Sequence, residues 1–111
     1  MHEIGIVQSV LDMATQAARR AGAARVHRLK VRVGALSGVV PEALQFAFDA
    51  LRPGSVAAEA LLELEWVPVA YWCAKCESEF STEEDECPGC HEFSSEMRHG
   101  LELELTSLEV S

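Results

Sequence analysis

Apolar residues recur every three or four positions over the first twenty residues of the chain. This is the spacing of one face of an α-helix, and the positions are Ile4, Val7, Val10, Leu11, Ala14, Ala17, Ala18 and Ala21. Arg19 and Arg20 complement the negative end of a helix dipole, and Gly22 can adopt the left-handed conformation that closes a helix. The pattern therefore predicts a helix that ends near Gly22.

A strand and a second helix follow. Residues 28–33 alternate basic and apolar side chains up to Gly34, which predicts a strand with one basic and one apolar face. Pro41 favours a first helical turn, and Pro53-Gly54 ends the apolar stripe that follows it. That stripe consists of Ala43, Leu44, Ala47, Phe48 and Leu51.

Two further segments, residues 62–66 and 101–105, alternate apolar residues with glutamate. Opposite charges that face each other across strands stabilise pairing, so we expect the basic strand 28–33 to lie between the two acidic strands, or at least beside them. The predicted fold class is α+β: a three-stranded, mainly antiparallel sheet packed with two helices, plus an inserted zinc-ribbon-like module. We interpret the apolar residues of all these stripes as core.

Composition restricts the class of protein. The 111 residues carry 9 Lys+Arg against 18 Asp+Glu, and residues 53–111 hold two basic and fourteen acidic side chains. This acidic surplus disfavours nucleic acid as a partner. The sequence contains no apolar run long enough for a membrane span and begins without the basic region of a secretory signal, so we expect a cytoplasmic protein with reduced cysteines.

Four cysteines form two pairs with the same spacing, Cys73-x2-Cys76 and Cys87-x2-Cys90, separated by ten residues. Two such pairs can close a tetrahedral four-sulfur shell around Zn(II), with iron or paired redox disulfides as less favoured alternatives. A filled shell has no open position for water, so the site is predicted to be structural. His91 is either a surface residue or a nitrogen donor that replaces one sulfur or lies just outside the sulfur shell.

The segment around these cysteines differs from the rest of the chain because it is acidic and has few aliphatic residues. A segment this short cannot build a useful hydrophobic core by itself and needs a metal or disulfides. We therefore predict an inserted zinc-binding domain at residues 71–99, with residues 1–70 and 100–111 forming the main α/β domain.

The first three residues offer a second set of metal donors. The Met1 α-amine, the backbone nitrogen of His2 and the His2 imidazole can close on one square-planar ion such as Ni(II) or Cu(II). A backbone nitrogen, a second histidine or a partner protein would supply the fourth ligand. The alternative is that His2 is only a polar residue at a helix start, where Glu3 complements the dipole.

Several motifs together resemble the HypA/HybF family of nickel metallochaperones. They are Met1-His2-Glu3, residues 33–39 leading into Glu42 and residues 46–49, and Cys87-Pro88-Gly89-Cys90-His91. The resemblance runs from residue 1 to about residue 108. It implies a nickel-binding α/β domain with an inserted zinc domain, in which His2 and the Met1 amine bind nickel and Glu3 shapes or supports that site. It also implies that Cys73, Cys76, Cys87 and Cys90 bind structural zinc.

The function implied is that of a nickel carrier, not an enzyme, for [NiFe]-hydrogenase maturation and conceivably for urease too. The implied partners are the nickel-handling GTPase HypB and the hydrogenase large-subunit precursor, and the oligomeric state is open, a homodimer included. The chain departs from some relatives in having Ser78 where they have a histidine, while His99 could be an equivalent of their distant nickel ligand. His27 is interpreted as a surface or edge residue.

Two rival functions belong to other classes. One is a zinc-ribbon protein-protein adaptor that transfers no nickel, which nickel binding would exclude. The other is a zinc hydrolase, which needs an open coordination position and a poised acid or base. Glu42 or Asp49 could serve as that group, but nothing in the sequence places either of them near the metal.

Overall fold

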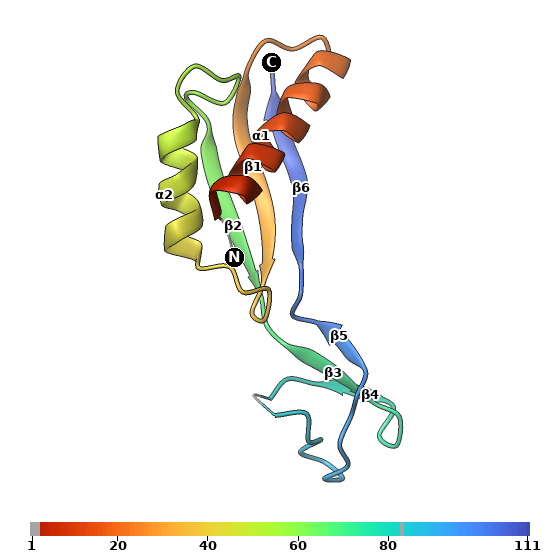
Figure 1. Ribbon diagram of the computed structural model, residues 1–111. Helices are drawn as coiled ribbons and strands as arrows, with labels where there is room; N and C mark the ends of the chain where they lie inside the picture. Colours follow the sequence, from red (N-terminus) through yellow and green to blue (C-terminus); the bar gives the residue numbers. More distant parts are fainter. Residues whose placement is uncertain (1–2, 83) are drawn as a thin grey trace.

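The computed structural model describes residues 3–82 and 84–111, which form two helices and two small sheets (Figure 1). In chain order the elements are α1 (Glu3–Arg20), β1 (Val26–Gly34), α2 (Pro41–Leu51), β2 (Leu61–Val67), β3 (Ala70–Cys73), β4 (Ser78–Phe80), β5 (Met97–His99) and β6 (Leu103–Val110). The molecule is elongated, with principal extents of 53 × 26 × 16 Å. Neither helix of the described residues is both long and apolar enough to cross a membrane.

Helix α1 follows the predicted apolar stripe, and Gly22 beyond its end has a φ of 68°, in the left-handed region. Most of the stripe is buried, including Val7, Leu11 and Ala14. Ile4, which is 59% exposed, and Ala21, which is also exposed, are exceptions, so their assignment to the core was wrong. Ile4 faces an open groove beside α2, and Ala21 lies beyond the end of α1.

The larger sheet has the strand order β2-β1-β6. Strand β1 pairs with β2 in parallel, because α2 carries the chain back between them, and with β6 in the antiparallel sense. The predicted position of the basic strand between two acidic strands is confirmed. Arg28 lies 2.8 Å from Glu63 and 3.8 Å from Glu109, and Arg32 lies 3.1 Å from Glu65.

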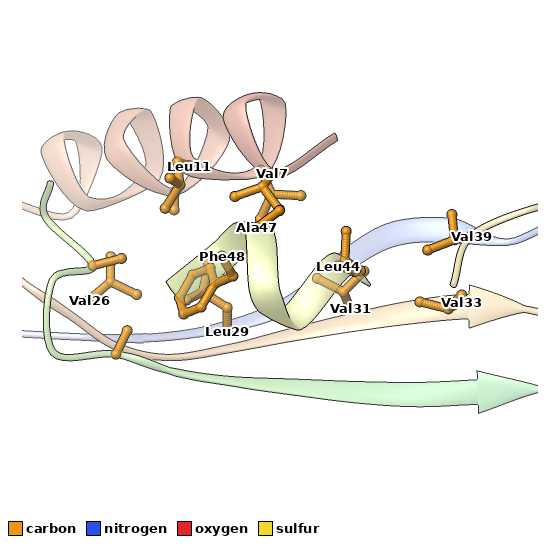
Figure 2. Packing of buried hydrophobic residues seen from close by; sticks show 14 of the residues in the cluster. Val7, Leu11, Val26, Leu29, Val31, Val33, Val39, Leu44, Ala47 and Phe48 are labelled. Carbon is orange, nitrogen blue, oxygen red and sulfur yellow. The ribbon is translucent and has the colours of Figure 1, made fainter. Parts of the chain in front are cut away.

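Both helices cover one face of this sheet and enclose the hydrophobic core. Figure 2 shows Val7 and Leu11 of α1 pointing toward α2, with Phe48 above Leu29 of β1. The largest fully buried side chains are Phe48, Leu29, Leu44, Val7, Val26, Val31 and Val33. The apolar face of β1 therefore packs against the helices, while its arginines lie on the opposite, charged face.

The smaller sheet has the order β4-β3-β5 and is antiparallel throughout. Its buried residues are Cys73, Phe80 and Cys87, and Tyr71 stacks on Phe80 with ring centroids 5.6 Å apart. The predicted α+β class is confirmed, since two helices accompany two small, mostly antiparallel sheets. The division of the chain into domains at residues 71 and 99 stays a prediction.

The two sheets meet where the chain passes from β5 into β6. Gly34 donates its N–H to the carbonyl of Glu102 at 2.7 Å, and Leu36 donates to the carbonyl of Gly100 at 2.7 Å. Strand β6 begins at Leu103, two residues later than the alternation from Leu101 suggested. Leu101 is 66% exposed and is not a core residue, because this stretch makes the crossing between sheets.

Candidate metal centres

The four cysteine thiols converge at the end of the smaller sheet. Cys73 is the last residue of β3, Cys76 lies in the turn before β4, and Cys87 and Cys90 flank a turn next to the isolated bridge between Glu86 and Phe93. Their four Sγ atoms all lie within 4.8 Å of one another. The two-residue gap within each pair therefore places both thiols of a turn on the same side, as the spacing predicted.

The sulfur positions fit a tetrahedral metal ion. The Sγ atoms of Cys73 and Cys90 are 3.5 Å apart, and those of Cys76 and Cys87 are 3.9 Å apart. A zinc ion with Zn–S bonds of about 2.3 Å places its ligands about 3.8 Å apart along each edge of the tetrahedron. The chain thus presents four soft donors at the separation that Zn(II) needs, with two of the four cysteines buried.

Backbone groups around the thiols set their acidity. The N–H of Cys90, followed by that of Gly89, lowers the pKa of Cys87 to about 7. Contacts with the other thiols, first Cys90 and then Cys73, raise the pKa of Cys76 to about 12. Of these two thiols, Cys87 therefore loses its proton more readily than Cys76 at neutral pH. Since every thiol must lose its proton to bind a metal, affinity falls as the pH falls.

Neither of the two nearby histidines belongs to the sulfur cluster. His91 has a φ of 62° and places its Nδ1 3.1 Å from Glu86 on the exposed surface. His99 lies in β5, with its Nδ1 2.9 Å from Glu102 and its Nε2 3.9 Å from Glu79. Both imidazoles therefore contact carboxylates, and the four sulfurs alone form the candidate metal site among the described residues of this region.

The predicted nickel ligands Met1 and His2 lie outside the described residues. Glu3, which follows them, is half-buried in the first turn of α1. It lines a groove of about 320 Å³ between the two helices, together with Ile4, Ala43, Phe46 and Ala47. The first turn of α1 therefore borders an open groove, which the sequence pattern did not predict.

Two features were not singled out from the sequence, and only the first carried a signal there. Phe46 points outward from α2, between buried Leu44 and Phe48, and helical periodicity alone predicts that position. Glu102 accepts a 2.7 Å hydrogen bond from the N–H of Gly100 and contacts His99, at the crossing between the sheets. Hydrophobic periodicity does not predict these contacts, because they depend on a turn in which Gly100 has a φ of 133°.

Comparisons with known proteins agree over the whole chain. A family model described as "Hydrogenase/urease nickel incorporation, metallochaperone, hypA" matches residues 1–110. The "Hydrogenase maturation factor HypA" of Picosynechococcus sp. is 45% identical over 112 residues, and that of Chloroflexus aurantiacus is 38% identical over 113 residues. Each alignment covers 99% of both chains.

Solved structures show the same fold. The solution structure of the Ni metallochaperone HypA from Helicobacter pylori superposes with a TM-score of 0.71 at 27% identity, covering 99% of this chain and 97% of that one. A second structure, described as the solution structure of HypA protein, gives a TM-score of 0.76 at 27% identity. It covers 100% of this chain and 97% of the other.

The matching family model and the solved structure of the same fold both describe metallochaperones, which is the class of protein that this chain resembles. Within that class, the chain belongs to the HypA family. The resemblance stated from the sequence motifs is therefore confirmed, and so is the general function of hydrogenase or urease nickel incorporation that the family description gives.

Proposed function

We propose that this chain binds one Ni(II) through the Met1 amine, the His2 backbone nitrogen and the His2 imidazole, and delivers it during [NiFe]-hydrogenase maturation. Glu3 supports that site, and Cys73, Cys76, Cys87 and Cys90 hold a structural Zn(II). The family match over residues 1–110 is the observation that carries the proposal, because it includes both the terminal donors and the cysteines.

The two sites differ in a way that suits the two roles. A four-thiolate shell is complete, so zinc bound there cross-links the turns of the smaller sheet and leaves no position for another ligand. The terminal donors number three, so a ligand from a recipient can enter before the old ones leave. Since a backbone nitrogen must lose its proton to bind nickel, the terminal site weakens as the pH falls.

The recipients proposed are the nickel-handling GTPase HypB and the hydrogenase large-subunit precursor. The family description names urease beside hydrogenase, so a urease pathway is a second destination for the same cargo. The remaining alternative is a zinc-ribbon adaptor that transfers no nickel. Nickel binding at the N-terminus would exclude this adaptor, and the absence of such binding would favour it.

The test is a nickel titration of the chain with its native Met1 amine, followed by calorimetry and by absorption of the d-d bands. Two altered forms serve as comparisons: His2→Ala, and a chain lengthened by one residue before Met1. Zinc is counted in all three samples. We expect one Ni(II) per native chain, loss of that nickel in both altered forms, and one zinc per chain throughout.

Equal nickel binding by all three forms, or by none, would contradict the terminal ligand set and favour the adaptor. Zinc content below one per chain in the native form would contradict the four-cysteine shell independently of nickel. The two parts of the proposal can therefore fail separately.

A further inference from the structure

The groove between the starts of the two helices has apolar walls that no described residue covers. Phe46 of α2 is 76% exposed and Ile4 of α1 is 59% exposed, and both line the groove. Large exposed apolar side chains that cluster in one place mark interaction sites more often than isolated ones do. Ile4 and Phe46 therefore form one exposed apolar cluster at this groove.

The floor of the groove is made of small side chains. Ala43 and Ala47 lie one helical turn apart on α2, and Ala47 is only 3% exposed. Beneath them Leu44 and Phe48 turn into the core, so the packing of α2 does not depend on Phe46. Small floor residues between two large apolar walls leave space for the side chains of another molecule.

The charges around this groove all have one sign. Residues 3–18 of α1 and 41–51 of α2 contain four charged side chains, Glu3, Asp12, Glu42 and Asp49, and each of them is acidic. Glu42 and Asp49 are four residues before and three residues after Phe46, which makes them its neighbours along the helix. Phe46 thus projects from an acidic surface.

Basic residues occur only at the far ends of the two helices. Both helices begin on the side nearer the smaller sheet and run away from it (Figure 1). Arg19, Arg20 and Arg52 follow at their carboxyl ends, and Arg52 is already engaged with Asp49 at 3.7 Å and with the carbonyl of Ala60 at 2.8 Å. The charged side chains of the two helices nearest the groove are therefore acidic, although Arg52 partly neutralises Asp49.

We propose that this groove docks a helix of the partner that exchanges nickel with this chain, a helix with one apolar side bordered by lysine or arginine. The apolar side fills the groove between Ile4 and Phe46, and the basic border meets Glu42 and Asp49. The inference rests on the proposed function, because it assigns the partner of the terminal nickel site.

A second copy of the chain is a poorer occupant. A symmetric contact through this face would bring the same four acidic side chains of two copies together, and juxtaposed like charges disfavour an interface. A basic amphipathic helix has no such conflict. Its position also suits metal exchange, since Glu3 lines the groove and directly follows His2 in the sequence.

The experiment measures binding of purified HypB to the full chain by calorimetry at low and physiological salt. Phe46→Ala is compared with Phe93→Ala, because Phe93 is 73% exposed but lies in the cysteine-containing segment. Removing a central apolar contact from an interface raises Kd by about tenfold or more. We expect that increase for Phe46→Ala and less than about a twofold change for Phe93→Ala.

A second variant tests whether the acidic side chains beside the groove attract the partner. Glu42→Lys should slow association at low salt and have a much smaller effect at physiological salt, because screening weakens exposed charge interactions. His2→Ala separates this proposal from the proposed function, since it should abolish nickel uptake while HypB binding persists. Circular dichroism confirms that each variant is folded.

Three results would overturn the proposal. The first is HypB binding by Phe46→Ala within twofold of the original chain. The second is an equal loss in Phe46→Ala and Phe93→Ala, which would show that the groove is not specific. The third is loss of self-association in Phe46→Ala, measured by sedimentation, with HypB binding retained, which would make a second copy the occupant.

Discussion

The two sheets of this protein have three strands each but are held together by different means. The larger sheet and its helices bury a cluster of fifteen residues, whereas the smaller sheet buries three, of which two are cysteines. Apolar burial can hold the first, and it is too small to hold the second. The smaller sheet therefore needs a further cross-link, which the proposed zinc shell of four cysteines would supply.

The same contrast appears in the use of charge. On the larger sheet, Arg28 and Arg32 each lie between glutamates of the two neighbouring strands. The acidic surplus of residues 53–111 is thereby partly neutralised in β2 and β6. The remaining acidic surplus also suggests that residues 53–111 dock onto a basic partner surface, which is a hypothesis separate from the groove between the helices. An association rate that does not change with salt would contradict it.

The largest effect should come from removing one sulfur ligand. Cys87→Ser leaves an incomplete shell, and structural zinc binding contributes roughly 10–16 kcal/mol in small zinc-dependent modules. We expect zinc content to fall and the amides of β3, β4 and β5 to lose protection against hydrogen exchange, while those of β1 keep theirs. Hydrogen exchange read by NMR or mass spectrometry measures both regions in one sample.

The control for this variant is Ser95→Ala, which changes an exposed hydroxyl of the same segment. It should retain zinc and amide protection. If Cys87→Ser kept the smaller sheet protected without zinc, the contrast between a metal-held and a core-held region would be wrong.

The next effect should fall on the other region. Phe48 is 1% exposed in the centre of the core, and Phe48→Ala creates a cavity that lowers the free energy of unfolding by about 3–5 kcal/mol. Zinc stoichiometry should remain that of the original chain. Urea unfolding followed by circular dichroism gives the first quantity, and metal analysis of the native protein gives the second.

Phe46→Ala is the matched control, since the same residue type on the same helix is 76% exposed. Its free energy of unfolding should change by less than about 1 kcal/mol. Equal destabilisation by the two variants would show that burial does not distinguish the two faces of α2.

Much of this architecture follows from local pattern. Residue spacing alone predicts which face of a helix or strand is apolar and which thiols share a turn. This holds for the stripe of α1, the alternation in β1 and the paired cysteines. Cross-strand charge also placed β1 between β2 and β6. These predictions needed no knowledge of the tertiary structure.

What sequence reasoning missed depends on how elements meet. Ile4 belongs to the apolar stripe yet is exposed, and Leu101 alternates with glutamates yet precedes β6. At the crossing between the sheets, the carbonyl of Glu102 accepts a hydrogen bond from Gly34, which is far away in the sequence. Hydrophobic periodicity indicates which side of an element is apolar, but not where along its length the neighbouring element stops.

The junction between the two regions should give a smaller effect. A Cβ atom added at Gly34 would lie 2.3 Å from the carbonyl carbon of Gly100 and 2.6 Å from the nitrogen of Glu102. Because these are backbone atoms, Gly34→Ala must displace the crossing strands, and we expect a loss of about 1–3 kcal/mol in thermal or urea unfolding.

Gly5→Ala is the control, since a Cβ there meets nothing within 4 Å. Gly5 lies in the first turn of α1, and replacing it by alanine should stabilise the helix by up to about 0.5–1 kcal/mol. Opposite signs for the two substitutions would support a close approach at the junction. A neutral Gly34→Ala would instead mean that the two sheets can separate at this point without cost.

The smallest effect concerns a single carboxylate, that of Glu102, at the junction between the two regions. Burial opposes the charge of Glu102, but the Gly100 N–H and His99 outweigh it and lower the pKa of that carboxyl below its ordinary value. A lowered folded-state pKa contributes stability at pH values above the unfolded-state pKa, and this contribution is lost as the pH falls through the folded-state pKa. Glu102→Gln should therefore cost about 1 kcal/mol at neutral pH and progressively less in acid. Urea unfolding at several pH values measures this difference, and Glu59→Gln, at a side chain that is 86% exposed, is the control. A difference that stayed constant into acid would mean that packing, and not the charge of Glu102, joins the core-held region to the metal-held one.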